Sequence, residues 1–210
     1  MTKQEALDII LATKVIAVIR MPDEKKVFNV IEALEKGGVK ALEVTMTTPG
    51  ALEIVAFLSS RKTPGILVGA GTVLDVETAT EAIRAGADFL VSPVTNFDMI
   101  RVCGEENRFV APGALTPTEI LAAWQAGADV VKVFPASSLG PRYFKDLKGP
   151  LPQVRLMPTG GVTLENARQF IESGACCVAI GTALLDEKAI ESEDWNLLTL
   201  RGRNLMDSLA

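Results

Sequence analysis

The stretch "QAGADVVKVF", residues 125–134, is one of four related segments that together indicate how the chain folds. The other three are "EKGGVKALEVT" (35–45), "RAGADFLVS" (84–92) and "ESGACCVAIG" (172–181). Each joins a helical pattern to a short apolar run through a glycine, and these glycines are Gly38, Gly86, Gly127 and Gly174. Glycine suits a helix C-terminus that needs a positive φ. The chain is therefore predicted to pass from helix to buried strand in the same way four times.

The spacing of these glycines predicts that each copy covers two strand–helix units. The separations are 48, 41 and 47 residues, which is too long for one such unit. Further apolar runs lie between the copies, and the eight expected strands are 14–20, 41–45, 66–69, 89–92, 109–112, 130–134, 155–158 and 177–180. Helical patterns such as "TPTEILAAWQAG" separate them, and this one opens with a capping box from Thr116 to Glu119.

Eight alternating strands and helices predict an α/β fold, a (β/α)8 TIM barrel. We expect one compact domain over residues 1–210, with an N-terminal helix at about residues 2–12. A doubly wound open sheet is the alternative, but it usually binds its ligand through a Gly-x-Gly-x-x-Gly motif. The stretch "GAGTVL" (69–74) has only the first two of those glycines.

Composition excludes several functions. The 210 residues are 48% hydrophobic, enough for one sizeable core, and the net charge of −5 argues against nucleic acid or an anionic membrane as partner. No apolar run reaches the ~18–20 residues that cross a bilayer, and the N-terminus has no signal-peptide pattern, so a cytoplasmic location is expected. The three cysteines, Cys103, Cys176 and Cys177, are interpreted as buried small residues in a reducing compartment.

The chain contains no histidine. This excludes Ser-His-Asp and Cys-His catalysis and the usual His-ligated metal site. Acid–base chemistry would fall to carboxylates, lysine, Tyr143 or water. We therefore expect no metal site and no cofactor.

Lys132 stands in the apolar run "DVVKVF". Strand alternation directs Val131 and Val133 toward the helices and Lys132 toward the barrel interior. Counting five residues from each of the four glycines gives Glu43, Val91, Lys132 and Ala179. Because each layer inside such a barrel takes side chains from alternate strands, these four are predicted to share a layer.

The pairing of Lys132 with Glu43 favours Schiff-base chemistry. A lysine in a water-poor pocket loses part of its preference for the charged form, and its neutral amine is a nucleophile toward carbonyl groups. A nearby carboxylate can then move protons. Two alternatives remain: a buried salt bridge, which often adds no net stability, or an edge strand with Lys132 in solvent.

Two glycine-containing loops predict a phosphate site. They are "PTGGVTLEN" (158–166) and "IGTALL" (180–185), which follow the seventh and eighth expected strands, where TIM barrels often hold phosphate. Backbone N–H groups at Gly160, Gly161 and Gly181 and the hydroxyl of Thr182 would contact the anion. The alternative is that these glycines only make tight turns.

At this point the sequence resembles the 2-keto-3-deoxy-6-phosphogluconate (KDPG) aldolases, also called KHG/KDPG aldolases. The segments that carry the resemblance span nearly the whole chain: "LEVTMTTPGA", "VGAGTVL", "FLVSP", "APGALTPTE", "VKVFPAS", "MPTGGV" and "AIGTALL". The resemblance implies a class I aldolase on a small, homotrimeric TIM barrel. Such an enzyme cleaves KDPG to pyruvate and glyceraldehyde 3-phosphate, and in many members also 4-hydroxy-2-oxoglutarate to pyruvate and glyoxylate.

The resemblance also implies roles for individual residues. Lys132 is the Schiff-base lysine and Glu43 the proton acceptor and donor. Thr72 lies against pyruvate, Pro93 and Phe134 wall the pocket, and Thr159 is associated with stereochemical preference. Gly160, Gly161, Gly181 and Thr182 hold the substrate phosphate.

The chain departs from the family pattern at one place. Many members read "LEVTLRT", whose arginine binds the pyruvate carboxylate, whereas this chain has Thr47 there. Relatives without that arginine carry one at the end of the first strand, where this chain has Arg20. Arg20 is therefore expected to bind the carboxylate. Its alternative role is to pair with Asp23 or Glu24.

Two other functions stay open. Galactonate-type aldolases read "AVGGV" where this chain reads "PTGGV", so Thr159 favours the gluconate type, although "FPASSLGP" (134–141) is similar to the galactonate type. A barrel that binds a sugar phosphate without cleaving it would have the same loops, but it would not need Lys132 and Glu43. In either case the partner is a small phosphorylated keto acid.

Overall fold

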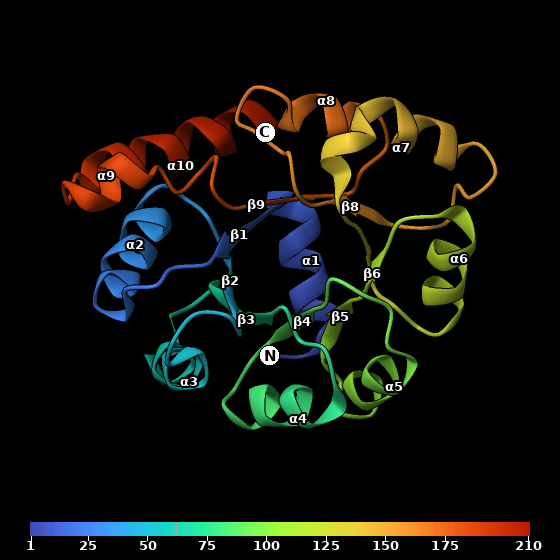
Figure 1. Ribbon diagram of the computed structural model, residues 1–210, viewed down its shortest axis with the longest axis horizontal. Coiled ribbons are helices and arrows are strands. Elements are labelled where there is room, and N and C mark those ends of the chain that lie inside the picture. The colour runs from blue at the N-terminus through green and yellow to red at the C-terminus, as the bar shows by residue number, and fades with distance from the viewer. Residues whose placement is uncertain (62) are drawn as a thin grey trace.

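The structure, a computed structural model, describes residues 1–61 and 63–210, and the side chain of Glu24 lies outside this description. Short parallel strands occupy the middle of the molecule and helices surround them (Figure 1). The strands are β1 Val15–Ile19, β2 Ala41–Thr45, β3 Leu67–Gly71, β4 Phe89–Val91, β5 Phe109–Ala111, β6 Gly113–Ala114, β7 Val131–Val133, β8 Leu156–Pro158 and β9 Val178–Ile180. The α-helices are α1 Lys3–Thr13, α2 Glu24–Lys36, α3 Ala51–Arg61, α4 Val76–Arg84, α5 Phe97–Glu105, α6 Pro117–Gln125, α7 Gly140–Lys148, α8 Ala167–Glu172, α9 Glu187–Glu191 and α10 Trp195–Leu209.

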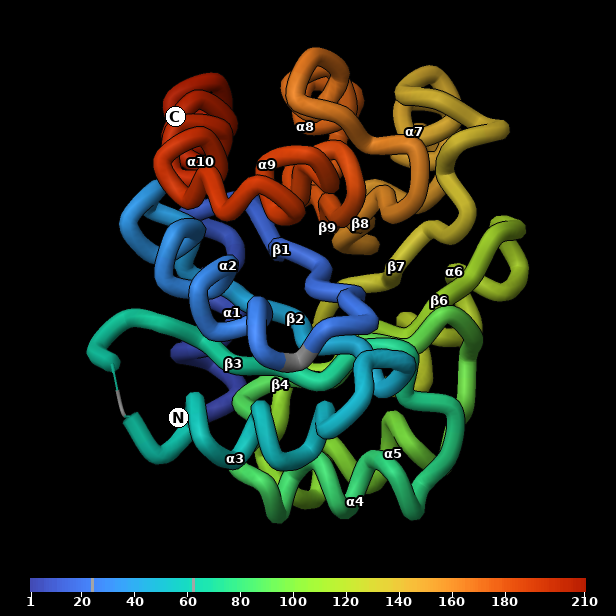
Figure 2. The backbone as a smooth tube through the Cα atoms, turned by 60° about the vertical axis from the view of Figure 1, so that its left-hand side comes forward, coloured from blue at the N-terminus to red at the C-terminus, as the bar shows by residue number. Residues whose placement is uncertain are grey.

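The strands form two parallel sheets that curl around a common interior (Figure 2). One has the order β5-β4-β3-β2-β1-β9 and the other β6-β7-β8. A bridge between Thr159 and Ala179 and a hydrogen bond from Cys176 N to Leu156 O link β8 to β9. The structure is therefore an α/β fold with a curled parallel sheet.

The fifth predicted strand is divided in the structure. The expected run 109–112 ends as β5 at Ala111, and β6 follows directly after Pro112. Proline has no N–H to donate to a ladder, which accounts for the break. The Pro112 carbonyl still accepts a hydrogen bond from Lys132 N, at 2.9 Å. The sequence did not predict β6, which pairs with β7 on the side away from β8.

Alternation along the strands separates two apolar clusters. The outer cluster lies between strands and helices and contains Val131 and Val133, together with Leu42 and Val44. The inner cluster contains Ala41, Leu67, Phe89, Phe109, Val130, Met157, Cys177 and Ala179. This confirms the predicted alternation in "DVVKVF" and "ALEVT". The inner aromatic rings, Phe89 and Phe109, pack edge to face with centroids 6.2 Å apart.

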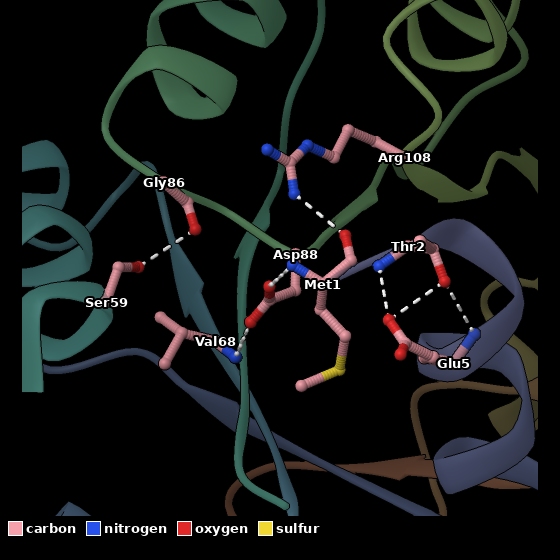
Figure 3. Close-up of polar contacts among 8 residues, drawn as sticks. All are labelled: Met1, Thr2, Glu5, Ser59, Val68, Gly86, Asp88 and Arg108. Carbon is pink, nitrogen blue, oxygen red and sulfur yellow. Dashed lines mark hydrogen bonds and ion pairs between the residues drawn. The ribbon is translucent and has the colours of Figure 1, made fainter. Parts of the chain in front are cut away.

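Helix α1 covers the end of the interior where the strands begin. Its residues Ala6, Leu7 and Ile10 pack into the inner cluster. In Figure 1, α1 lies at the centre of the view with the strands around it. The N-terminal ammonium lies 3.6 Å from Asp88 Oδ1, and Arg108 donates to the Met1 carbonyl at 3.2 Å (Figure 3). We call this the base of the sheet, and the opposite end its rim.

The helix ends predicted from glycines and from a capping box are confirmed. Gly38, Gly86, Gly127 and Gly174 all have φ between 92° and 104°, as the helix C-termini were predicted to need. The capping box of Thr116 with Glu119 is confirmed, and Thr2 makes a second one with Glu5. Among the described residues, no helix has the length and apolar character of a membrane span.

Candidate active site

Strands β2 and β7 place one carboxylate and one amine inside the curled sheet. Glu43 is fully buried and Lys132 is 5% exposed. Both occupy inward positions: Ala41 and Val130, two residues earlier on the same strands, belong to the inner cluster. Each group changes the pKa of the other by its charge, so the two lie close enough to interact.

The environment of Lys132 favours its neutral form. Burial lowers the pKa of the Lys132 amine, the charge of Arg20 lowers it further, and the charge of Glu43 opposes both. The ammonium lies 5.1 Å from the centroid of the Phe134 ring. Strand β7 lies between β6 and β8, which excludes the edge-strand alternative.

Glu43 is buried without a hydrogen bond to either carboxylate oxygen. Burial raises its pKa, although Lys132 and Arg20 act in the opposite direction. No direct ion pair joins Glu43 to Lys132 in the part of the chain that the structure describes, so the salt-bridge alternative is not supported. A neutral acid beside a neutral amine is the state that this burial favours.

Glycine at position 71 makes room for the Glu43 carboxyl group. A Cβ at Gly71 would lie 1.9 Å from Glu43 Oε1. The next residue, Thr72, has a φ of 58°, which is uncommon for a residue with a side chain. Such backbone conformations are concentrated at functional sites.

A cavity of about 440 Å³ opens at the rim. Seven of the predicted site residues line it: Arg20, Phe134, Thr159, Gly160, Gly161, Gly181 and Thr182. Its lining also includes Val18, the β1 partner of Glu43, and Ala179, so its inner end reaches the strand level of the carboxylate. The remaining predicted residues, Glu43, Thr47, Thr72, Pro93 and Lys132, are not part of its lining.

Phe134 separates this cavity from a second one. The second cavity, of about 480 Å³, is lined by Pro93, Val94, Phe97 and Leu115 together with Phe134. Phe134 is 38% exposed, and the face of its ring lies near the Lys132 amine. The structure therefore brings Pro93 and Phe134 together beside Lys132, and the other side of the Phe134 ring faces Gly160 of the first glycine loop.

Arg20 and Thr72 meet across the rim. The Arg20 Nη2 donates to Thr72 Oγ1 at 3.3 Å. Thr47 is exposed, and its hydroxyl lies 2.9 Å from that of Thr45. Asp23 accepts a hydrogen bond from Lys25 N at the start of α2, and no ion pair between it and Arg20 is found among the described residues. A pairing with the Glu24 side chain lies outside the described residues.

The two glycine loops border the outer part of the 440 Å³ cavity. Gly160 and Gly161 both have positive φ values, 81° and 77°. A Cβ at Gly161 would lie 2.6 Å from the Ser137 Cα, so this glycine is required by close packing as well as by its φ. Thr182 is exposed toward the cavity, and Thr159 Oγ1 is buried without a partner.

Sequence reasoning missed several charged residues of this cavity. These are Lys26, Glu187 and Glu191, and Asp23, which was considered only as a partner of Arg20, lines it as well. Lys26 Nζ donates to the carbonyls of Ile190 and Glu191, at 3.1 and 3.3 Å. The amphipathic pattern of 24–36 indicates a surface helix, but it does not reveal that one lysine of its first turn faces α9.

The cysteines and acidic residues form no metal centre among the residues described. Cys103 and Cys177 are buried, and Cys176 is half-buried. Burial and the charge of Asp129 raise the pKa of Cys103 to about 12, so this thiol is not activated.

Comparison with known proteins was consistent with this geometry. Residues 7–200 match the family model for KDPG and KHG aldolase. A 2-dehydro-3-deoxy-phosphogluconate aldolase of Haemophilus influenzae is 30% identical over 98% of this chain and 97% of its own length. A KDPG aldolase from Legionella pneumophila, solved with pyruvate captured as a covalent carbinolamine intermediate, superposes with a TM-score of 0.84 at 29% identity, over 95% of this chain and 97% of that one. A native KDPGal structure gives the same TM-score at 28% identity, over 92% and 93% of the two chains.

Proposed function

Since the chain belongs to the KDPG and KHG aldolase family, we propose that it is a class I aldolase that cleaves 2-keto-3-deoxy-6-phosphogluconate to pyruvate and glyceraldehyde 3-phosphate. It would also cleave 4-hydroxy-2-oxoglutarate to pyruvate and glyoxylate. The observation that carries the proposal is the buried amine of Lys132, whose pKa is lowered by burial, together with the buried and unpartnered carboxyl group of Glu43.

The reaction begins with addition of the Lys132 amine to the C2 carbonyl of the substrate. The nitrogen loses a proton and the carbonyl oxygen gains one, which gives a carbinolamine. Protonation of the hydroxyl then expels water and leaves an iminium. Glu43, whose pKa is raised by burial, supplies this proton and becomes a carboxylate.

Cleavage follows because the iminium accepts electrons. The C4 hydroxyl loses its proton to Glu43, the C3–C4 bond breaks, and its electron pair forms an enamine with C2. The aldehyde leaves, and Glu43 returns the proton to C3. Water then hydrolyses the pyruvyl iminium and regenerates the amine, so one carboxyl group serves every proton transfer.

The cavity orients the substrate along its length. Arg20 is suited to the substrate carboxylate because its fork of N–H donors matches a carboxylate in a fixed plane, and Thr72 lies beside it. Phe134 and Pro93 form an apolar wall on the other side. The phosphate would lie against Gly160, Gly161, Gly181 and Thr182 at the outer end.

We infer that the two curled sheets close into one eight-stranded barrel that spans the whole chain. The bridge between Thr159 and Ala179 supports closure on one side. On the other side, β5 and β6 are consecutive and separated only by Pro112. Closure would leave no free sheet edge.

We infer also that the chain assembles as a homotrimer. Exposed apolar side chains at the rim support a contact between copies: Val94 is 48% exposed, Phe97 58% and Leu115 37%. They surround the second cavity beside Phe134, so a neighbouring subunit would shield that wall of the site. Light scattering of the purified protein tests the trimer, and a monomer would contradict it.

Borohydride trapping tests the proposed chemistry. Reduction in the presence of pyruvate should fix one pyruvyl group on Lys132, identified by peptide mass. A label on Lys145 or Lys148 instead would refute the assignment. A barrel that only binds a sugar phosphate would not be labelled, which separates this rival from an aldolase.

The galactonate-type alternative is tested with both epimeric substrates. Thr159, buried beside the cavity with an unpartnered hydroxyl, favours the gluconate type. We expect a higher kcat/KM for the gluconate-derived substrate, and Thr159→Val should reduce the difference. Equal or reversed values in the unmodified enzyme would favour the galactonate type.

A further inference from the structure

The segment that follows β9 carries one wall of the cavity. Residues Gly181, Thr182 and Leu185 of its first turn line the cavity, as do Ile190 and Glu191 at the end of α9. The segment has no strand partner, so its shape depends on contacts with neighbouring helices. Figure 2 shows α9 and α10 close together beside β9.

Arg201, on α10, holds the first turn of this segment from behind. Its Nη2 donates to the Ala183 carbonyl at 2.5 Å and its Nε to the Leu184 carbonyl at 3.3 Å. Its Nη1 lies 3.7 Å from Asp186 Oδ2. Arg201 is not part of the cavity lining, so it acts on the side of the turn away from the substrate.

These contacts set the direction of the peptide groups in the turn. Leu184 N and Leu185 N both donate to the Gly181 carbonyl, at 2.8 and 2.9 Å, which gives the turn a helical sense. In such a turn the carbonyls point one way and the N–H groups the other. Arg201 binds the carbonyl end, and no backbone bond from the N–H of Thr182 or Ala183 is found in the described part of the chain.

Asp186 extends the same arrangement into α9. While one of its carboxylate oxygens lies near Arg201, the other accepts from Ala189 N at 3.0 Å and caps the helix. The far end of α9 is bound by Lys26 of α2. The whole segment is thus fixed at its start by α10 and at its end by α2.

We propose that Arg201 is a positioning residue for phosphate recognition: it orients the turn after β9 so that the backbone N–H groups of Thr182 and Ala183 face the phosphoryl end of the substrate. The inference rests on the proposed aldolase function, and it assigns phosphate affinity in part to a residue that does not touch phosphate. Removing Arg201 leaves the amine, the carboxylate and the carboxylate-binding Arg20 in place.

The experiment compares Arg201→Met with Arg203→Met. Arg203 lies on the same helix, is exposed and makes none of these contacts, so it controls for loss of a surface charge. Each enzyme is assayed with the phosphorylated substrate and with unphosphorylated 4-hydroxy-2-oxoglutarate, and for competitive inhibition by inorganic phosphate. R201M should raise KM for the phosphorylated substrate and Ki for phosphate roughly tenfold, the loss expected for hydrogen bonds from a charged group.

Cleavage of the unphosphorylated substrate distinguishes a loss of phosphate binding from a general structural defect, because a general defect would lower activity toward this substrate as well. R201M should cleave it with KM and kcat within about twofold of the unmodified enzyme, and Arg201→Lys should recover part of the phosphate affinity because it keeps the charge. A loss of equal size with both substrates, or no loss with either, overturns the inference. If R201M does not fold by circular dichroism, Arg201→Gln takes its place with the same expected result.

Failure of the proposed function would look different. An unmodified enzyme that phosphate does not inhibit, and that has the same KM for both substrates, would refute the phosphate site and with it this inference. An unmodified enzyme that phosphate inhibits, together with an equally inhibited R201M, would refute the role of Arg201 alone.

Discussion

Two carboxylates are buried in the described chain, one near each end of the sheet, and their surroundings differ. Asp129, at the base, is 6% exposed and fully partnered: it accepts from Val110 N at 2.9 Å and pairs with Lys3 Nζ at 3.0 Å. Glu43, toward the rim, is 0% exposed and has no hydrogen bond to either oxygen. A buried polar group costs free energy unless it is partnered, so the first supports the fold and the second opposes it.

Along β2 and β7, the side chains inside the sheet change from apolar at the base to ionisable toward the rim within two residues. Val130 packs in the inner cluster and Lys132 follows it, and Ala41 likewise precedes Glu43. The base is filled by the rings of Phe89 and Phe109, and the rim holds unpartnered oxygens of Glu43 and Thr159, although Arg108 Nε at the base also lacks a partner. The lesson is that unsatisfied groups on well-packed strands indicate chemistry. The predictions below test this division, from the largest expected effect to the smallest.

Lys132→Met should abolish both the borohydride adduct and cleavage, because no amine remains. It should also stabilise the protein near neutral pH, since burial lowers the pKa of Lys132 and the folded chain binds this proton less tightly than the unfolded chain does. The pKa of Lys132 is lowered on folding, so the unfolded state binds more protons and wild-type stability rises with pH up to the ordinary lysine pKa. Urea unfolding at several pH values should show this rise in the wild type and its absence in the variant. A destabilised variant would contradict the division.

Glu43→Gln should lower kcat by ~10²–10⁴-fold, the usual contribution of a general acid–base group. The amide is nearly isosteric, so the fold should be kept and some pyruvyl adduct should still form on Lys132. Single-turnover assays with borohydride trapping separate adduct formation from cleavage. A variant with normal kcat would reduce Glu43 to a structural group.

Two glycines of β3 give a matched pair of substitutions. In Gly71→Ala the new Cβ would meet Glu43 Oε1, Cδ and Cγ at 1.9, 2.5 and 2.6 Å, so the carboxyl group must shift and kcat should fall by roughly 10²-fold, with a smaller loss of stability than a clash with a packed ring would cause. In Gly69→Ala it would meet the Phe89 ring at 2.3 Å in a packed core, so stability should fall by about 1–3 kcal/mol. Thermal melts and kcat on both variants test the contrast.

The control for this pair is Gly104→Ala in α5, where a Cβ would meet nothing within 4 Å. It should be neutral or slightly stabilising, because alanine restricts the unfolded chain. An equal loss of stability in Gly71→Ala and Gly69→Ala would contradict the contrast, because it would mean that the Glu43 carboxyl group is packed as firmly as the Phe89 ring.

Arg20→Ala should raise KM for the keto acid by roughly 10–100-fold, the loss expected for hydrogen bonds to a charged group, with little change in melting temperature. Arg142→Ala is the control, because that side chain is 91% exposed and lies on α7. An unchanged KM would make Arg20 structural. The carboxylate would then be bound by backbone N–H groups near Gly71 and Thr72, or by Thr47.

Much of the arrangement that supports Glu43 and Lys132 could be predicted from the sequence, because it depends on local patterns. Strand alternation predicted the inward direction of Lys132, and the repeated glycines predicted where four of the eight expected strands begin. Pro112 divides the fifth strand by a rule that is also local, but its position within an apolar run concealed the break. The predicted bounds of β2 are those of the structure, and the bounds of the other strands differ by one or two residues, as expected where short strands meet loops.

The contacts across the rim could not be predicted, because they join residues far apart in the chain. Arg20 meets Thr72, and Arg201 meets Ala183, through the side-by-side arrangement of elements rather than through any pattern within one of them. The same holds at the base, where Lys3 meets Asp129. Alternation shows that a charge faces inward, but not whether a partner meets it there.

Lys3→Met gives the smallest expected effect and tests the base. Burial raises the pKa of Asp129, while Val110 N and Lys3 act to lower it. Without Lys3 the buried carboxylate keeps only one backbone partner, so stability at pH 7 should fall by about 1 kcal/mol, a small value because the Lys3 side chain is 31% exposed.

The pH dependence of the loss in folding stability distinguishes a lost ion pair from a simple packing defect in Lys3→Met. Burial raises the folded pKa of Asp129 and Lys3 holds it below the still higher value of the variant, so the contribution of Lys3 is fully present above the folded pKa of the variant and is lost as the pH falls through the folded pKa of the wild type. The stability difference between variant and wild type should therefore vanish below about pH 4. The kcat of the variant should be unchanged, since Asp129 lies at the base. A fall in kcat without a fall in stability would mean that the two ends of the sheet are coupled, and the division between them would fail.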